Sequence, residues 1–241
     1  MKSLSIYMLG ALMGLFLPAQ GQSFTTEINE PLQQTTRELI SQAHLISPER
    51  KEKLVELADY LLEQKNDSVH FNALFVCTHN SRRSHITDTW FQYALIYYGI
   101  SGYNSFSGGL EATAFHPNAI AALQRAGFSV AFDKKVTNPV VSVSPGHYPV
   151  WHKQSKIYTH PVNPKSNFVA VMVCSDADQS CPVVDGASAR FSLPYDDPRY
   201  FDNTPSQDLK YDETVELIGR EILFMIGYLK NQLIISEESR K

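Results

Sequence analysis

The stretch of sequence that decides the fold is FVCTHNSRRS, which spans residues 75–84 of a chain of 241 residues. It places Cys77 and Arg83 six positions apart, after an apolar run and before a segment, 84–98, with helical periodicity. A buried strand, a compact polar loop and a helix in this order form one unit of an α/β sheet. The loop of such a unit lies at the carboxyl edge of the sheet, where ligands bind.

The spacing of Cys77 and Arg83 suits the binding of a tetrahedral oxyanion. A five-residue loop that closes onto a helix start can turn its backbone N–H groups inward and form a nest for an anion. The positive helix end favours a thiolate at Cys77, and Arg83 offers a planar fork to two oxyanion oxygens. We therefore expect thiolate attack on a bound phosphorus or arsenic atom. The predicted oxyanion-binding residues are Thr78, His79, Asn80, Ser81, Arg82, Arg83 and Ser84.

Composition and charge limit the classes of function. The chain carries 21 Lys and Arg against 25 Asp and Glu, a net charge of -4, and 43% hydrophobic residues. This is an ordinary globular composition without the basic excess that nucleic-acid binding needs, so we expect no nucleic-acid partner. Three cysteines do not make a disulfide scaffold, and at least one thiol stays unpaired in any internal pairing.

The first 21 residues have the pattern of a cleavable signal peptide. Lys2 precedes an apolar stretch at 4–17, and small residues precede a cut between Gly21 and Gln22. A membrane anchor is the alternative, but the apolar stretch is shorter than the roughly 20 residues of a spanning helix. We therefore predict an exported, periplasmic protein that is not held in the membrane after cleavage.

Periodicity along the rest of the chain predicts an α/β fold. The expected strands are 70–76, 103–106 and 168–173, and the expected helices are 31–45, 48–65, 84–98, 116–126 and 211–232. The prolines and alternating runs at about 136–164 predict a hairpin-like insertion beside the sheet. The predicted divisions are a signal peptide at 1–21, a helical extension at 22–68, a catalytic domain at 69–232 that contains the insertion, and a tail at 233–241.

Three further segments accompany the cysteine loop in a fixed order. They are SGGLE at 107–111 with HPNA at 116–119, CSDADQSCP at 174–182, and Asp-Asp-Pro at 196–198. Together the four motifs resemble the low-molecular-weight protein tyrosine phosphatase superfamily, in particular its thioredoxin-coupled arsenate reductase branch, over residues 71–230. The resemblance implies a small doubly wound parallel sheet, to which the helical extension and the insertion are additions.

The resemblance also implies a role for each residue of the predicted site. Cys77 would attack in line, while Arg83 and the loop amides hold the oxyanion oxygens. Asn80 and Ser84 would hold the loop and the thiolate in place through hydrogen bonds. Asp197 would protonate the departing oxygen, although a turn residue before a proline is the alternative interpretation.

Cys174 and Cys181 decide the second half of the predicted reaction. In the reductase branch, Cys174 would attack Cys77 to release arsenite, and Cys181 would then attack Cys174 to carry a disulfide outward. A structural disulfide and a pair of zinc ligands are the alternatives, and no second Cys or His pair stands at matching spacing. We expect no metal and no cofactor, and a thioredoxin-like protein as the reductant.

Two positions of the cysteine loop depart from the family pattern. His79 stands where the family loop usually has glycine, and Arg82 stands where it has a second cysteine. Neither change removes the nucleophile, the nest or Arg83.

Three functions stay open, of which the sequence favours arsenate reduction. The alternatives are a phosphatase acting on phosphotyrosine or a small phosphomonoester, and a non-catalytic protein that binds oxyanions.

Overall fold

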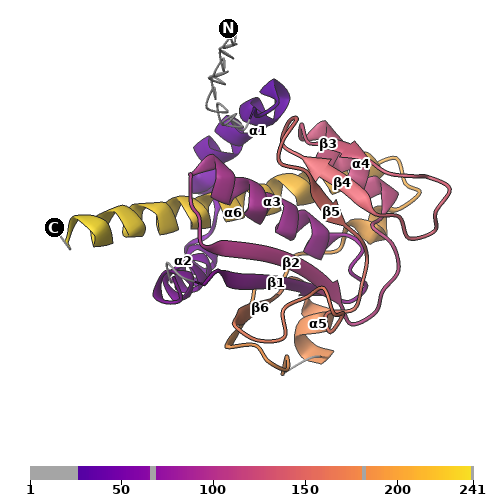
Figure 1. Ribbon diagram of the computed structural model, residues 1–241. Coiled ribbons are helices and arrows are strands. Elements are labelled where there is room, and N and C mark those ends of the chain that lie inside the picture. Colours follow the sequence, from indigo (N-terminus) through magenta and orange to yellow (C-terminus); the bar gives the residue numbers. More distant parts are fainter. Residues whose placement is uncertain (1–26, 66–68, 181–182, 240–241) are drawn as a thin grey trace, which may run out of the picture.

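The computed structural model describes residues 27–65, 69–180 and 183–239 and has a four-stranded parallel sheet at its centre (Figure 1). The strand order is β2-β1-β6-β7, and every pair is parallel. The chain winds outward from β1 in both directions, first to β2 and then to β6, which confirms the doubly wound α/β fold. The strands are β1 (Phe71–Cys77), β2 (Tyr103–Gly109), β6 (Phe168–Met172) and β7 (Ala189–Ser192).

Strand β1 and helix α3 (Arg83–Tyr97) form the middle of the hydrophobic core. Every residue of β1 except Asn72 is buried, as expected for an inner strand of a parallel sheet, which is covered on both faces. Helix α3 is buried along most of its length and packs against the long helix α6 (Gln207–Glu238). A Cβ atom on Gly219 would lie 2.6 Å from the Trp90 ring, so glycine permits this close approach.

The N-terminal extension consists of two helices and a short 3-10 turn that pack on α6. They are α1 (Glu30–Ser41), the 3-10 turn η1 (Gln42–Leu45) and α2 (Pro48–Glu63). The helix expected at 31–45 therefore ends at Ser41, and its last residues tighten into the 3-10 geometry common at helix ends. Ser47 caps α2 as expected, because its side chain accepts a hydrogen bond from the Arg50 amide.

The predicted insertion is a small antiparallel sheet that begins earlier than expected. Helix α4 (Pro117–Arg125) leads into β3 (Ser129–Ala131), which pairs with β4 (Val141–Ser144). Strands β4 and β5 (Trp151–Lys153) form the expected hairpin. Strand β3 was missed because three residues with mostly exposed side chains carry too little alternation to reveal a strand.

A buried ion pair fastens this insertion to the core. Lys153 Nζ lies 2.6 Å from Asp88 Oδ2, and both side chains are almost fully buried. Asp88 also accepts hydrogen bonds from Ser105 and Gln92 through its other oxygen. Burial lowers the pKa of Lys153, although Asp88 favours its charged form. The insertion is thus joined to α3 by the Lys153–Asp88 ion pair, in which each buried charge is compensated by the other.

Three further features differ from the sequence-based expectations. Helix α5 (Ser175–Ser180) and strand β7 were not predicted, because α5 is a short polar sequence and no β7 residue is fully buried. Helix α6 begins before Tyr211 and continues to Glu238, so most of the predicted tail at 233–241 is helical. In Figure 1 this end of α6, drawn in yellow, projects beyond the rest of the fold.

The predicted signal peptide at 1–21 lies outside the described residues. Within the part of the chain that the structure describes, no helix is both long enough and apolar enough to cross a membrane.

We expect Lys153→Met to lower the free energy of unfolding by about 3–5 kcal/mol, because removing one partner of a buried ion pair leaves an uncompensated charge. Urea denaturation followed by circular dichroism measures this loss. The matched double variant, Asp88→Asn with Lys153→Met, carries no such charge and should recover most of the loss. A double variant as unstable as the single one would contradict the explanation.

Candidate active site

The predicted nucleophile lies at the carboxyl end of the central strand. Cys77 is the last residue of β1 and is 3% exposed, and Arg83 is the first residue of α3. The residues between them form the loop that joins β1 to α3, called here the cysteine loop (77–84). Because α3 begins at this loop, its unpaired N-terminal amides and its positive dipole end are directed toward the loop. This is the placement that anion binding requires.

Two hydrogen bonds connect the thiol to the middle of the loop. Cys77 Sγ lies 3.1 Å from Ser84 Oγ, and Asn80 Nδ2 donates to the same Ser84 oxygen at 2.9 Å. Asn80 has a φ of 44°, in the left-handed region that asparagine tolerates better than most residues. The structure therefore brings Cys77, Asn80 and Ser84 together as the sequence led us to expect.

The insertion and β2 support the loop from outside. The Lys156 amide donates to Asn80 Oδ1 at 2.8 Å, and Ser155 Oγ donates to the His79 carbonyl at 3.2 Å. A Cβ atom on Gly109 would lie 2.6 Å from the Asn80 nitrogen, so β2 can approach the loop only with glycine at its end. The insertion, whose role the sequence left open, thus contacts the cysteine loop directly.

Arg83 is paired with the predicted acid. Its Nη2 donates to Asp197 Oδ2 at 2.5 Å, and its Nη1 donates to the Tyr195 carbonyl at 2.9 Å. Both side chains of the ion pair are 8% exposed. Arg83 Nε is buried and makes no hydrogen bond to any of the described residues. The guanidinium therefore keeps its Nε donor unused, while Nη2 holds Asp197 and Nη1 holds the Tyr195 carbonyl.

Asp197 has a structural contact as well as this ion pair. It precedes the 3-10 turn η2 (Pro198–Phe201), and its Oδ1 accepts a hydrogen bond from the Arg199 amide at 3.0 Å. Its Oδ2 also lies 3.9 Å from Arg199 Nε. Asp197 thus caps a turn before a proline and also faces Arg83 of the cysteine loop. We refer to residues 195–202 as the acid segment.

Cys174 lies beside the cysteine loop at the end of the neighbouring strand. It follows β6 by two residues and is fully buried. Its Sγ is 3.4 Å from Thr78 Oγ1 and accepts a hydrogen bond from the Ala177 amide at 3.4 Å. Cys181, the third predicted thiol, lies outside the described residues.

Sequence comparison finds relatives of this chain over about half of its length. No family model matches the chain. Over 124 residues it is 27% identical to arsenate reductase 2 of Staphylococcus epidermidis, which covers 52% of this chain and 76% of that protein. The arsenate reductase of Brevibacillus brevis is also 27% identical over 124 residues, covering 52% of this chain and 74% of that protein.

Solved structures of similar shape have low sequence identity to this chain. The low-molecular-weight protein tyrosine phosphatase from T. tengcongensis has a TM-score of 0.44 at 17% identity and covers 65% of this chain and 98% of that one. The YwlE mutant from Bacillus subtilis has a TM-score of 0.45 at 16% identity, covering 66% and 99%.

The chain is thus similar to arsenate reductases over about half of its length, in line with the resemblance that its motifs show to the low-molecular-weight protein tyrosine phosphatase superfamily.

The two departures from the superfamily loop lie on its outer side. His79 is partly exposed, and its Nε2 lies 3.8 Å from Glu111 Oε2. Arg82 Nε donates to Tyr211 Oη at 2.7 Å, and its Nη2 donates to Asp202 Oδ2 at 3.0 Å. Arg82 is one of the predicted oxyanion-binding residues, and its charge is paired with the end of the acid segment.

Sequence reasoning missed several residues that hold this site together. Tyr195 supplies a carbonyl to Arg83, Asp202 and Tyr211 bind Arg82, and the Lys156 amide binds Asn80. Each of these partners lies at least 76 residues from the loop residue that it contacts. Local patterns carry no signal for such pairs. Only the position of Tyr195 and Asp202, on either side of the Asp-Asp-Pro motif, pointed toward the site.

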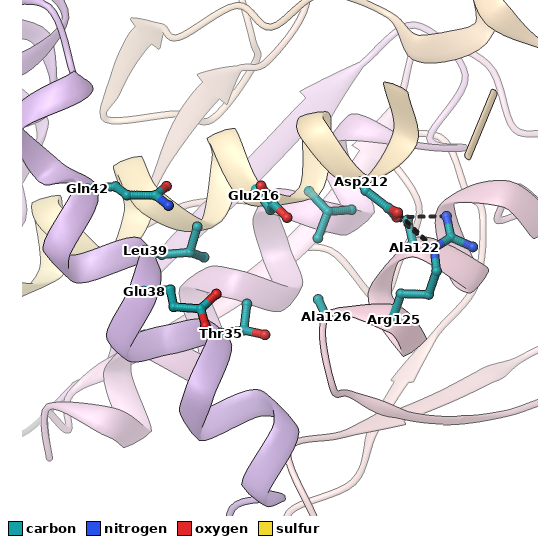
Figure 2. A pocket seen from close by; sticks show the side chains of 10 residues that line it. Thr35, Glu38, Leu39, Gln42, Ala122, Arg125, Ala126, Asp212 and Glu216 are labelled. Atoms are coloured by element: carbon teal, nitrogen blue, oxygen red, sulfur yellow. Dashed lines mark hydrogen bonds and ion pairs between the residues drawn. The ribbon is translucent and has the colours of Figure 1, made fainter. Parts of the chain in front are cut away.

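A polar cavity of about 240 Å³ lies between α1, α4 and α6 (Figure 2). Glu38 and Glu216 face it, and Arg125 pairs with Asp212 at its edge, as Figure 2 shows. Burial and the nearby Asp212 raise the pKa of Glu216. No residue of the cysteine loop lines this cavity. Within the described ranges, no group of His, Cys, Asp and Glu side chains is placed to hold a metal ion.

We expect Gly109→Ala to weaken the binding of inorganic phosphate and to destabilise the fold by about 1–3 kcal/mol, because overpacking forces the backbone apart. The new methyl would meet the Glu111 carbonyl and the Asn80 nitrogen. Calorimetric titration and urea denaturation measure the two effects. Gly227→Ala is the control, since its methyl would meet only the movable ring of Tyr98. Unchanged phosphate affinity in Gly109→Ala would show that this contact does not shape the loop.

Proposed function

We propose that the protein reduces arsenate to arsenite through Cys77, Cys174 and Cys181. The observation that carries this proposal is the position of Cys174, whose buried thiol contacts Thr78, the residue after the nucleophile. A phosphatase that hydrolyses a phosphocysteine needs no second thiol beside its loop. The relatives named arsenate reductase support the same choice.

In the opening step the Cys77 thiolate attacks the arsenic atom in line with a departing oxygen. A sulfur–arsenic bond forms and an arsenic–oxygen bond breaks. Asp197, which takes up a proton from solvent once the anion has displaced it from Arg83, gives that proton to the departing oxygen, which leaves as water. The amides of the cysteine loop and the unused Arg83 Nε bind the remaining oxygens. Arg83 Nη2 becomes a second donor to the anion when Asp197 leaves it for the departing oxygen.

Two thiol steps then reduce the arsenic. The Cys174 thiolate attacks Cys77 Sγ, and the electron pair of the sulfur–arsenic bond stays on arsenic, which leaves as arsenite. This step forms a Cys77–Cys174 disulfide. Cys181 next attacks Cys174 Sγ, which releases Cys77 as a thiolate and leaves a Cys174–Cys181 disulfide. The two electrons that arsenate gains are thus the two that the thiols lose.

The resulting disulfide needs an external dithiol. We propose a thioredoxin-like protein, because thiol exchange with a protein dithiol returns both cysteines to the reduced state. The pattern of residues 1–21 supports export, and the reductant would then act in the same compartment, which we propose is the periplasm.

Hydrolysis of an aryl phosphate is the second candidate function, and one observation favours it. Tyr200 is 72% exposed and Phe201 is 38% exposed, and both follow Asp197 in the acid segment. Exposed aromatic rings at this position can stack on an aryl group. In this reaction water would hydrolyse the phosphocysteine, and the second thiol would have no chemical role. A protein that only binds oxyanions would need neither the nucleophile nor the acid.

A single turnover of the fully reduced protein with arsenate is expected to yield one arsenite and a Cys174–Cys181 disulfide. Cys181→Ser should trap the Cys77–Cys174 disulfide, because deleting the last thiol stops the exchange one step earlier. Arsenite analysis and peptide mapping by mass spectrometry measure both products.

Two control variants separate the candidate functions in this experiment. Cys77→Ser should form no arsenite and no phosphocysteine. The double variant Cys174→Ser with Cys181→Ser should form no arsenite, while keeping any hydrolysis of p-nitrophenyl phosphate. Hydrolysis without arsenite in the wild type would select the phosphatase, and the absence of both would select the binding protein.

We expect Asp197→Asn to slow the first step by about 10²–10⁴-fold with aryl phosphates whose leaving groups are strongly basic, and much less with p-nitrophenyl phosphate. An amide cannot supply the proton that a basic leaving oxygen needs. The measurement is the burst of released phenol across a series of substituted phenyl phosphates. An equal loss for every leaving group would assign Asp197 to its turn-capping role alone.

A further inference from the structure

Two consecutive arginines of the cysteine loop hold opposite ends of the acid segment. Arg83 binds the Tyr195 carbonyl and Asp197 near the start of the segment. Arg82 binds Asp202 at its end. Since successive side chains at the start of a helix point in different directions, one short piece of loop can reach both ends.

Asp202 is the centre of a polar cluster in which four parts of the chain meet. Its Oδ1 accepts from Tyr211 Oη at 2.7 Å and from Asn118 Nδ2 at 3.2 Å, while its Oδ2 accepts from Arg82. The His116 ring lies parallel to the Tyr211 ring, and its Nε2 is 3.9 Å from Asp202 Oδ2. The cysteine loop, the acid segment, α4 and α6 are thereby joined at one carboxylate.

The protonation states of this cluster favour a lasting contact. Burial and the hydrogen bond to Asp202 raise the pKa of Tyr211 to about 12, so Tyr211 stays a donor. Burial acts against ionisation of Asp202, but the Tyr211 hydrogen bond and the Arg82 charge outweigh it and lower its pKa. Burial and the charge of Arg82 lower the pKa of His116, whose Nδ1 accepts from the Asn118 amide.

The two arginine contacts respond differently to a bound anion. An oxyanion in the loop competes with Asp197 for the Arg83 guanidinium, because both are anions that bind the same donors. Arg82 meets no such competition, since its Nε and Nη2 point to Tyr211 and Asp202 outside the loop. When the anion weakens the Arg83 contact, the contact to Asp202 is the arginine tether that remains.

We propose that Arg82 is a positioning residue that holds the acid segment over the cysteine loop after substrate has taken Arg83. It acts through Asp202 and keeps Asp197 within reach of the departing oxygen. The contact to Asp202 is made by Arg82, at the loop position where the superfamily usually has a cysteine. This proposal rests on the acid role proposed above for Asp197, but its first test does not.

Hydrogen exchange of the acid segment, measured with inorganic phosphate bound, is the first test. The amides of Arg199 and Asp202 donate to Asp197 Oδ1 and to the Arg199 carbonyl, so their exchange reports whether the segment stays folded. In the wild type we expect these amides to stay protected when phosphate is saturating. In Arg82→Met we expect protection without phosphate, through Arg83, and its loss when phosphate binds.

A matched control comes from another arginine–aspartate pair. Arg125→Met removes the pair with Asp212 shown in Figure 2, which joins α4 to α6 and makes its hydrogen bonds to Asp212 and the Asp208 carbonyl rather than to the acid segment. This variant should exchange like the wild type with and without phosphate. Should Arg82→Met fail to fold, Asp202→Asn replaces it, because the amide weakens the contact to Arg82 but preserves the shape of the side chain.

The second test is a double-mutant cycle on release of basic phenols. Arg82→Met should slow this release by about 10²-fold, the loss that a small misplacement can cause, and have a much smaller effect with p-nitrophenyl phosphate. Adding Arg82→Met to Asp197→Asn should slow phenol release little further, because Arg82 acts through Asp197. Arg82→Lys should restore part of the rate through Asp202.

Three results would overturn the proposal. The first is an acid segment that stays protected in Arg82→Met when phosphate is bound. The second is exchange that increases equally in the cysteine loop and in the acid segment without phosphate, which would indicate general unfolding. The third is full additivity of Arg82→Met and Asp197→Asn. If no phenol is released by any form, the proposed chemistry has failed, while the exchange result still decides whether the tether exists.

Discussion

The rest of the site depends on the two hydrogen bonds of the Asn80 side chain. Its amide nitrogen donates to Ser84 Oγ, the partner of the Cys77 thiol, and its oxygen accepts from the Lys156 amide. Asn80 is fully buried, so the loss of either bond would leave a desolvated polar group that costs about 1–3 kcal/mol. The left-handed backbone at this residue is maintained by both contacts together. The shape of the loop, the orientation of the thiol and the position of the insertion therefore depend on the same two hydrogen bonds.

The N-terminal extension and the insertion reach the site from two sides. The insertion supplies the Lys156 amide to the cysteine loop and is anchored by the buried pair of Lys153 and Asp88. The N-terminal extension supplies Arg50, which pairs with Glu221 of α6 and lies 4.6 Å above the Tyr195 ring. The carbonyl of Tyr195 in turn binds Arg83. One addition thus supports the loop, and the other supports the start of the acid segment.

The parts of the fold that were predictable from sequence are those with a local physical cause. The inner strands are continuous apolar runs, α2 has a serine cap, and the cysteine loop has its nucleophile and arginine at a fixed spacing. Strand β7 and helix α5 lack such a cause, since their residues are short, polar or half buried. The partners of Arg82 and Arg83 lie 112 to 129 residues away, so only the folded chain reveals them.

The ion pair of Arg83 and Asp197 explains how the site stays folded before substrate arrives. A buried guanidinium without a counter-charge would cost several kcal/mol, and so would a buried carboxylate. Each compensates the other while the loop holds no anion. A dianion that replaces the carboxylate must bind Arg83 more strongly than Asp197 does. The free energy needed to break the ion pair lowers the apparent affinity of every anionic ligand by the same factor. A ligand with fewer negative charges competes less well with Asp197, so the pair also selects for dianions. In the reaction proposed above, the displaced Asp197 carboxylate takes up a proton and stays beside the bound anion, where the departing oxygen needs that proton.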